Sequence, residues 1–160
     1  MLNSVFMMRF FAIVAVCIGI LACHSSQPNT DSLPVTQGVA GQVTELTGNQ
    51  MPSPDRTLPP PKGIKTTIYV YELTNLNQVE KGDNLPFFKA IRTKFIQSVE
   101  SDASGQYSLY LPPGQYSLFT KVDGLFYGNS FDGANNINAV KVEENKVARL
   151  NITISAKAVF

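Results

Sequence analysis

The chain has 160 residues with 13 basic and 12 acidic side chains, one histidine, two cysteines and no tryptophan. This near-neutral balance gives no electrostatic basis for binding nucleic acid. With His24 as the only histidine, we expect neither a Ser-His-Asp triad nor a histidine-rich metal site, and no cofactor.

An apolar segment near the N-terminus is typical of an export signal. Residues 10–22 read FFAIVAVCIGILA and carry no charge, and Arg9 precedes them. The length suits the apolar part of a secretory signal and falls short of the roughly 20 residues that a membrane-spanning helix needs. A buried core helix is the alternative, and the polar residues from His24 onward disfavour it. We therefore expect residues 1–22 to be a helical signal peptide.

The end of this segment resembles the lipobox of bacterial lipoproteins. Ile20-Leu21-Ala22-Cys23 has an aliphatic residue and a small residue at the matching distances before the cysteine. The resemblance implies cleavage before Cys23 and lipidation of its thiol, which attaches the protein to a membrane. Residues 23–36 would then be the lipidated cysteine and a flexible tether. Because His24 rather than Asp stands directly after Cys23, resemblance to enterobacterial lipoproteins favours the outer membrane of the cell envelope.

The rest of the chain, residues 37–160, has the pattern of a β protein. Short alternating runs of apolar residues are separated by turn-forming residues such as Asp123-Gly124. No long window shows the apolar period of a helix. The expected strands are 39–46, 65–73, 93–100, 106–111, 115–122, 125–131, 139–142 and 147–155. This spacing predicts an all-β fold, an antiparallel β-sandwich of seven or eight strands.

A motif in the middle of this region resembles the carboxypeptidase regulatory-like domains. Residues 101–118 read SDASGQYSLYLPPGQYSL, an acidic turn with glycine, an aromatic-bearing strand and then Pro-Gly-x-Tyr. The matching positions are Asp102, Gly105, Tyr107, Pro113, Gly114 and Tyr116. The resemblance spans roughly residues 37–160, apart from two long insertions. It implies a transthyretin-like (prealbumin-like) sandwich with an extracytoplasmic accessory role and no catalytic residues.

Aromatic residues in the two later loops are the candidate partner-binding side chains. Phe87 and Phe88 lie in the expected loop 75–90, where they either anchor a partner or cap one end of the sandwich. Phe126, Tyr127 and Phe131 lie in the region 124–138. They either form a platform for a sugar or peptide or belong to the core, as aromatic side chains commonly do.

The region 124–138 also contains oxygen-bearing side chains. Asp132, Asn135, Asn136 and Asn138 could supply ligands for calcium, which binds carboxylate and amide oxygens. The alternative is that Asn, Asp and Gly simply form turns here, because these residues tolerate turn conformations. The spacing matches no known calcium loop, and we expect no tightly held metal.

These observations predict a lipid-anchored β-sandwich in the cell envelope. Its expected role is that of a non-catalytic binding or scaffolding module for a protein or glycan partner. A small-ligand or calcium-dependent carrier is the alternative function. An envelope enzyme is the third, disfavoured because no thiol remains after lipidation and His24 lies beside the anchor.

Overall fold

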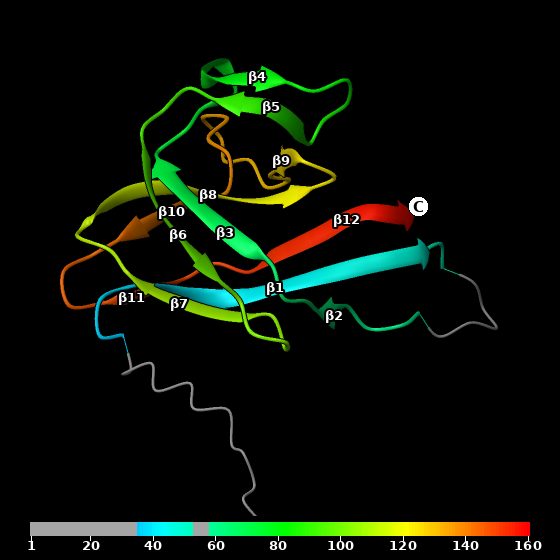
Figure 1. Ribbon diagram of the computed structural model, residues 1–160, viewed down its shortest axis with the longest axis horizontal. Helices are drawn as coiled ribbons and strands as arrows, with labels where there is room; N and C mark the ends of the chain where they lie inside the picture. Colours follow the sequence, from blue (N-terminus) through cyan, green and yellow to red (C-terminus); the bar gives the residue numbers. More distant parts are fainter. Residues whose placement is uncertain (1–34, 53–57) are drawn as a thin grey trace, which may run out of the picture. The chain divides into compact units, whose positions relative to one another are not determined.

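The described part of the chain is built from two β-sheets (Figure 1). The structure is a computed structural model that describes residues 35–52 and 58–160. The predicted signal peptide, Cys23 and His24 therefore lie outside the described residues. Over these two ranges the structure contains no helix of sufficient length and apolar character to span a membrane.

Twelve strands and one short 3-10 turn, Leu76–Gln78, make up the regular structure of these ranges. Apart from the long first strand, most are short, because glycine, proline, Asn and Asp recur between them. The strands are β1 (Gly38–Asn49), β2 (Lys62–Gly63), β3 (Thr67–Glu72), β4 (Val79–Lys81), β5 (Phe87–Ile91), β6 (Phe95–Glu100), β7 (Gln106–Tyr110), β8 (Gly114–Val122), β9 (Leu125–Tyr127), β10 (Ala139–Val142), β11 (Val147–Arg149) and β12 (Ile152–Val159).

The first sheet is organised around β1. The first half of β1 pairs with β7 in antiparallel and with β11 in parallel orientation. Its second half pairs with β2 in antiparallel and with β12 in parallel orientation. Between β11 and β12, the Leu150 N–H donates to the Ala40 carbonyl at 3.1 Å. The last strands therefore run beside β1 along most of its length, as Figure 1 shows for β1 and β12.

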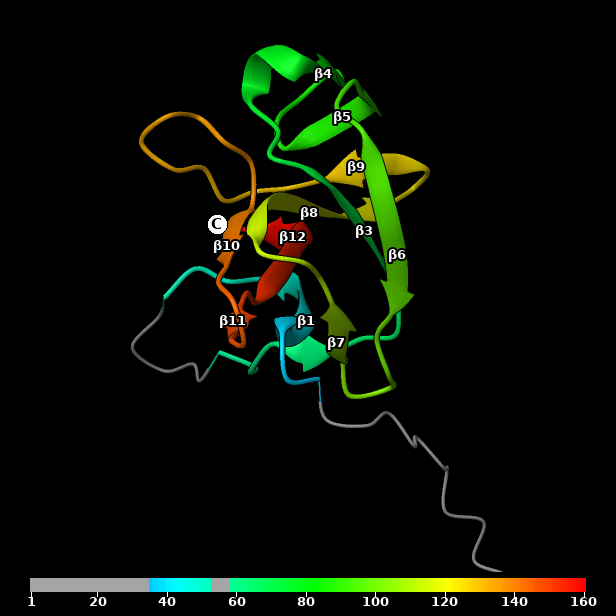
Figure 2. The ribbon, with the colours of Figure 1, turned by 90° about the vertical axis from the view of Figure 1, so that its left-hand side faces the viewer.

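The second sheet has the strand order β4-β5-β9-β8-β3-β6, with β10 also paired to β8. All of its pairings are antiparallel. A link of only three residues, 92–94, joins β5 to β6, although three strands separate them in the sheet order. So short a link requires the sheet to curl, and Figure 2 shows β6 descending directly from the end of β5.

The all-β sandwich predicted from the sequence is confirmed, with corrections to its strands. The structure has twelve strands rather than seven or eight, and β1 makes two parallel pairings within a mostly antiparallel fold. The expected loop 75–90 contains β4 and the start of β5. The expected strand 147–155 divides at Leu150-Asn151 into β11 and β12. The expected strand 125–131 ends at Tyr127.

The main core lies between the two sheets. Alternate side chains of β1, β7 and β12 face alternate side chains of β3, β8 and β10, as the period of two in a strand requires. Its fully or nearly fully buried aliphatic members are Val39, Val43, Ile68, Val70, Leu109, Leu111, Leu118, Val140, Val142, Ile152 and Ile154. This continuous apolar layer supplies the main driving force for folding.

A second core lies on the other face of the second sheet. It consists of Tyr71, Val79, Phe88, Phe119 and Ile137, of which Phe88, Phe119 and Ile137 are fully buried. The curl of the sheet and the β4-β5 hairpin close around these residues. The second sheet is therefore apolar on both faces, since neighbouring residues of β8 enter different cores.

The residues of the motif in 101–118 fix the turns on either side of β7. The Asp102 carboxylate accepts hydrogen bonds from the N–H groups of Ser104 and Gln106 at 2.8 and 2.9 Å. The Tyr107 hydroxyl donates to the Leu150 carbonyl at 2.6 Å, and the Tyr116 hydroxyl donates to the Pro112 carbonyl at 3.0 Å. Each of these bonds fixes a turn or joins two strands, so the motif serves the fold.

Tyr127 joins the two sheets at one edge of the sandwich. Its hydroxyl accepts a hydrogen bond from the Ser155 N–H at 3.0 Å and lies 3.1 Å from the Ser155 hydroxyl. Nearby, the Asn129 amide donates to the Thr153 carbonyl at 2.9 Å. Side chains that follow or belong to β9 therefore satisfy backbone groups of β12, a strand whose edge would otherwise be exposed.

Candidate functional site

Two of the five aromatic candidates are core residues. Phe88 and Tyr127 are fully buried, Phe88 in the second core and Tyr127 in the main core. The region around Phe87 and Phe88 is the strand β5, which pairs with β9, and not a loop. Neither Phe88 nor Tyr127 can contact a partner in the folded chain, which corrects their assignment as partner-binding residues.

The other three aromatic candidates reach the surface to different extents. Phe87 is half-buried and packs edge-on against Tyr127 with the ring centroids 5.4 Å apart. Phe126 is half-buried on the opposite face of the sheet, against the second core. Phe131 is 38% exposed and forms an isolated bridge with Ile137. The structure thus does not bring the five residues together as one platform.

The oxygen-bearing side chains of the region 124–138 are engaged in hydrogen bonds of the chain itself. One Asp132 oxygen accepts from the N–H groups of Ala134 and Asn136, both at 2.8 Å, and the other accepts from the Asn136 side chain at 2.8 Å. Asn135 has a φ of 62°, a left-handed turn conformation. The Asn138 amide donates to the Leu118 carbonyl at 2.9 Å. This geometry is that of a closed turn, and calcium would have to displace these bonds.

Asp132 is expected to make stability depend on pH. Hydrogen bonds from the Asn136 side chain and backbone lower the pKa of its carboxyl below the ordinary value of 3.8. A lowered folded-state pKa stabilises the fold above the unfolded-state value, and this contribution disappears as the pH falls through the folded-state pKa. Urea unfolding of the wild type and of Asp132→Asn should therefore show a larger loss on acidification for the wild type. Equal losses in the two proteins would contradict this role.

The second sheet carries an aromatic surface around Lys121. Tyr69 and Phe126 meet edge to face with their centroids 5.6 Å apart, and the Lys121 ammonium lies 5.1 and 4.6 Å from the two ring centroids. Phe95, 47% exposed, packs against Tyr71 at 5.4 Å. We call Lys121 and these four aromatic residues, of which Tyr71 is buried in the second core, the aromatic face.

The aromatic face combines properties of a contact surface. Exposed or half-buried rings supply apolar area with little loss of side-chain entropy on binding, and a neighbouring cation adds a polar contact. Sequence reasoning identified Phe126 but missed Lys121 and Phe95. Lys121 lies on β8 and Phe95 lies on β6, and these two strands are not adjacent in the sheet. Strand β3 lies between them, and this order cannot be read from the local sequence.

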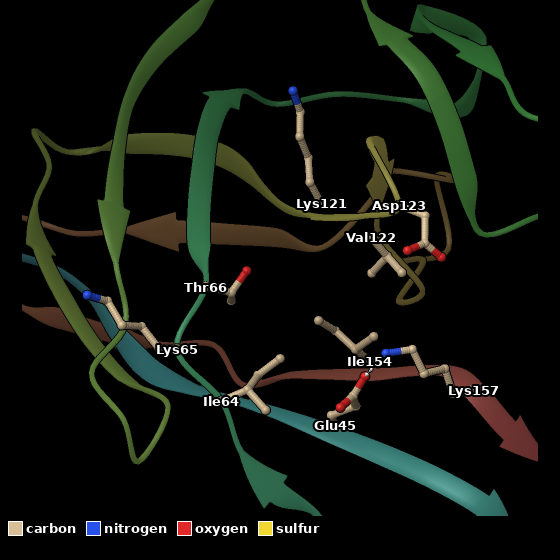
Figure 3. A pocket seen from close by; sticks show the side chains of 9 residues that line it. All are labelled: Glu45, Ile64, Lys65, Thr66, Lys121, Val122, Asp123, Ile154 and Lys157. Atoms are coloured by element: carbon tan, nitrogen blue, oxygen red, sulfur yellow. Dashed lines mark ion pairs between the residues drawn. The ribbon is translucent and has the colours of Figure 1, made fainter.

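A cavity of about 210 Å³ opens at one end of the sandwich (Figure 3). We call it the end cavity. Its apolar wall consists of Ile64, Val122 and Ile154, and its polar side chains come from β1, β8, β12, the link before β3 and the β8-β9 turn. The polar or charged lining residues are Glu45, Lys65, Thr66, Lys121, Asp123 and Lys157.

The charges at the end cavity are arranged in pairs. The Lys157 ammonium lies 3.2 Å from the Glu45 carboxylate, and Lys65 lies 3.1 Å from Glu100. Lys121 points away from the cavity, toward the aromatic face (Figure 3). Asp123 has a φ of 50° in the β8-β9 turn and makes no ion pair with any residue that the structure describes.

Neither surface has the composition of a metal centre. Within residues 35–52 and 58–160, no three His, Cys, Asp or Glu side chains lie close enough together to hold a metal ion. The arrangement of rings and paired charges suits non-covalent binding. Comparison of the chain with protein-family models, with curated proteins and with solved structures finds no match in any of the three.

Proposed function

We propose that this protein is a lipoprotein of the cell envelope, attached through Cys23, whose β-sandwich is a non-catalytic binding or scaffolding module. The observation that carries the proposal is the aromatic face. A cation over two half-buried rings, next to the exposed Phe95, forms a surface suited to a protein or glycan partner. The lipid anchor and the tether 23–36 would hold this surface near a membrane, with the outer membrane as the favoured location.

The role of the motif residues supports a non-catalytic assignment. Asp102, Tyr107 and Tyr116 bond backbone or side-chain groups of the fold and do not line the end cavity. Such roles agree with the resemblance to carboxypeptidase regulatory-like domains, which implies an accessory sandwich. We therefore extend the proposal to membership of that family.

A photo-crosslinking amino acid at position 95 tests the aromatic face in cells. Phe95 is exposed and lies beside Tyr71, so the substitution keeps the core intact. The matched control is position 110, because Tyr110 is 60% exposed on β7, in the other sheet. We expect a specific crosslinked product from position 95 only. Equal products from both positions, or none from position 95, would overturn the assignment of the face.

Cys23→Ser tests the anchor. We expect the wild-type chain to incorporate a labelled fatty acid and to sediment with membranes, because a thioether-linked diacylglycerol together with an N-acyl chain gives stable attachment. The variant should lose the label and leave the membrane fraction. Cys17→Ser serves as the control, since Cys17 lies inside the predicted signal and should be dispensable. Label retained in Cys23→Ser would contradict lipidation at this residue.

A small-ligand carrier is the second candidate function. The end cavity favours it, because the cavity has an apolar wall and charged groups at its mouth. Calcium is not expected to be part of such a carrier, since the Asp132 oxygens already accept three hydrogen bonds. An envelope enzyme remains the third and weakest proposal.

A further inference from the structure

We propose that the end cavity binds a small zwitterion with a branched aliphatic chain, such as a free aliphatic α-amino acid. This inference deepens the second candidate function, the small-ligand carrier, and does not rest on binding at the aromatic face. It is carried by an ion pair between the largely buried Glu45 and the exposed Lys157, by an apolar wall and by a separate carboxylate, all at one cavity.

The first observation is a charged residue on the core-facing side of β1. Val39 and Val43 point into the main core, and by strand alternation Glu45 continues the same face. Its side chain is only 24% exposed. An apolar residue would be expected at this position if the cavity served packing alone. The main core thus ends in a carboxylate instead of another aliphatic side chain.

The second observation is an irregularity that brings Lys157 to the same cavity. The register between β1 and β12 shifts between Glu45 and Thr47, where Glu45 is paired with Ile154 and Thr47 with Lys157. Regular alternation would place Ile154 and Lys157 on opposite faces, yet both line the cavity. A bulge of this kind redirects a side chain, and such bulges are frequent next to binding sites.

The volume limits the size of the ligand. An apolar protein cavity of about 150 Å³ holds a benzene molecule, so the end cavity at about 210 Å³ has room for roughly eight or nine non-hydrogen atoms. Ile64, Val122 and Ile154 would contact a branched alkyl group. A sugar ring would instead leave the hydroxyl groups that face these three side chains without partners.

The charges favour a ligand that carries both signs. Glu45 occupies only one of the three N–H donors of Lys157, so a ligand carboxylate can bind the same ammonium. Asp123 and Glu45 together can accept the hydrogen bonds of a ligand ammonium. A simple anion would be repelled by both carboxylates, and a simple cation would leave the additional donors of Lys157 unused. A zwitterion matches both groups and adds no net charge.

Ligand titration of the full chain tests the site. L-leucine, isovalerate and isoamylamine share the branched alkyl group but carry both charges, only the carboxylate and only the ammonium, respectively. We expect leucine to bind at least several-fold more tightly than either of the others by amide chemical-shift titration. The shifts should centre on Glu45, Asp123 and Lys157. No saturable shift with leucine, or equal affinity for isoamylamine or isovalerate, would overturn the proposal.

Asp123→Asn separates recognition from folding. Asparagine suits a two-residue turn with positive φ, so the variant should keep the β8-β9 turn while losing the charge. We expect its affinity for leucine to fall about tenfold, the loss of one charge-assisted hydrogen bond. Asp83→Asn is the control, since Asp83 is 93% exposed and pairs with Lys89 on a distant hairpin. Equal affinity of Asp123→Asn and wild type would contradict the site, and crosslinking at position 95 should be unchanged in either case.

Discussion

Replacing Gly105 by alanine is expected to lower the free energy of unfolding by about 3–5 kcal/mol. Gly105 has a φ of 82°, and a Cβ atom there would lie 2.1 Å from the Val43 carbonyl oxygen. The same residue accepts a hydrogen bond from the Val43 N–H at 2.8 Å, so the turn cannot move away without breaking a bond to β1. The cost of the left-handed backbone conformation and the cost of the clash with the Val43 carbonyl therefore add.

Gly124 provides the matched control for this variant. Its φ is 83°, nearly the same as that of Gly105, but a Cβ atom there would meet nothing within 4 Å. Gly124→Ala should cost only the left-handed strain, about 1–2 kcal/mol. Urea unfolding of the two variants separates strain from the clash. Equal losses would show that the close approach of the Asp102 turn to β1 contributes nothing.

Phe119→Ala is expected to cost a similar amount, about 3–5 kcal/mol, by opening a cavity in the second core. Phe119 is fully buried and packs edge to face against Tyr71, Phe88 and Phe126 with centroids 5.8 to 6.3 Å apart. These neighbours belong to β3, β5 and β9, so the loss of the Phe119 ring should destabilise the packing of the whole second core.

Hydrogen exchange measures where the effect of Phe119→Ala falls. We expect amides of β4 and β5 to lose protection before those of β1 and β12, since only the former pair depends on the second core. Phe95→Ala is the control, because Phe95 touches Tyr71 but is 47% exposed and should cost about 1 kcal/mol. Uniform loss of protection over both sheets would contradict a separately stabilised second core.

The fold class follows from local sequence signals, but the pairing does not. Alternation in the runs containing Leu109 and Ile152 predicts strands with one buried face, and both residues are buried. The β4-β5 hairpin was missed because Phe87-Phe88 interrupts alternation with two adjacent aromatics. Phe87 packs against the main core and Phe88 lies in the second core. Two adjacent aromatic residues indicate a strand only when both faces of its sheet are known to be covered.

The parallel pairing of β1 with β11 and β12 likewise could not be read from local patterns. The runs 147–149 and 152–159 look continuous because the break is made by bonds to another strand. Leu150 donates to Ala40, and the Asn151 side chain accepts from the Gln42 N–H at 3.0 Å. These contacts join residues more than one hundred positions apart, and no turn signal marks them.

The residues of the candidate surfaces likewise could not be grouped from the local sequence. Phe126 lies in a segment rich in aromatic residues, whereas Tyr69 and Lys121 lie in expected strands and carry no local signal of a binding surface. Their proximity depends on the pairing of β8 with both β3 and β9. Glu45 was equally inconspicuous, since a polar residue near the end of an expected strand is ordinary until its inward direction is known.

The pairing of β1 with β12 also sets the order in which the molecule can be completed. β1 is synthesised before the other described strands, yet one of its edges has its pairing partner in residues 152–159. Until those residues leave the ribosome, Val43 lacks its neighbour Ile152 and the main core has an open side. Contacts over such long chain separations form slowly. We expect the sheet around β1 to stay incomplete until residues 152–159 have been synthesised, and an incompletely folded polypeptide can be threaded through a narrow channel.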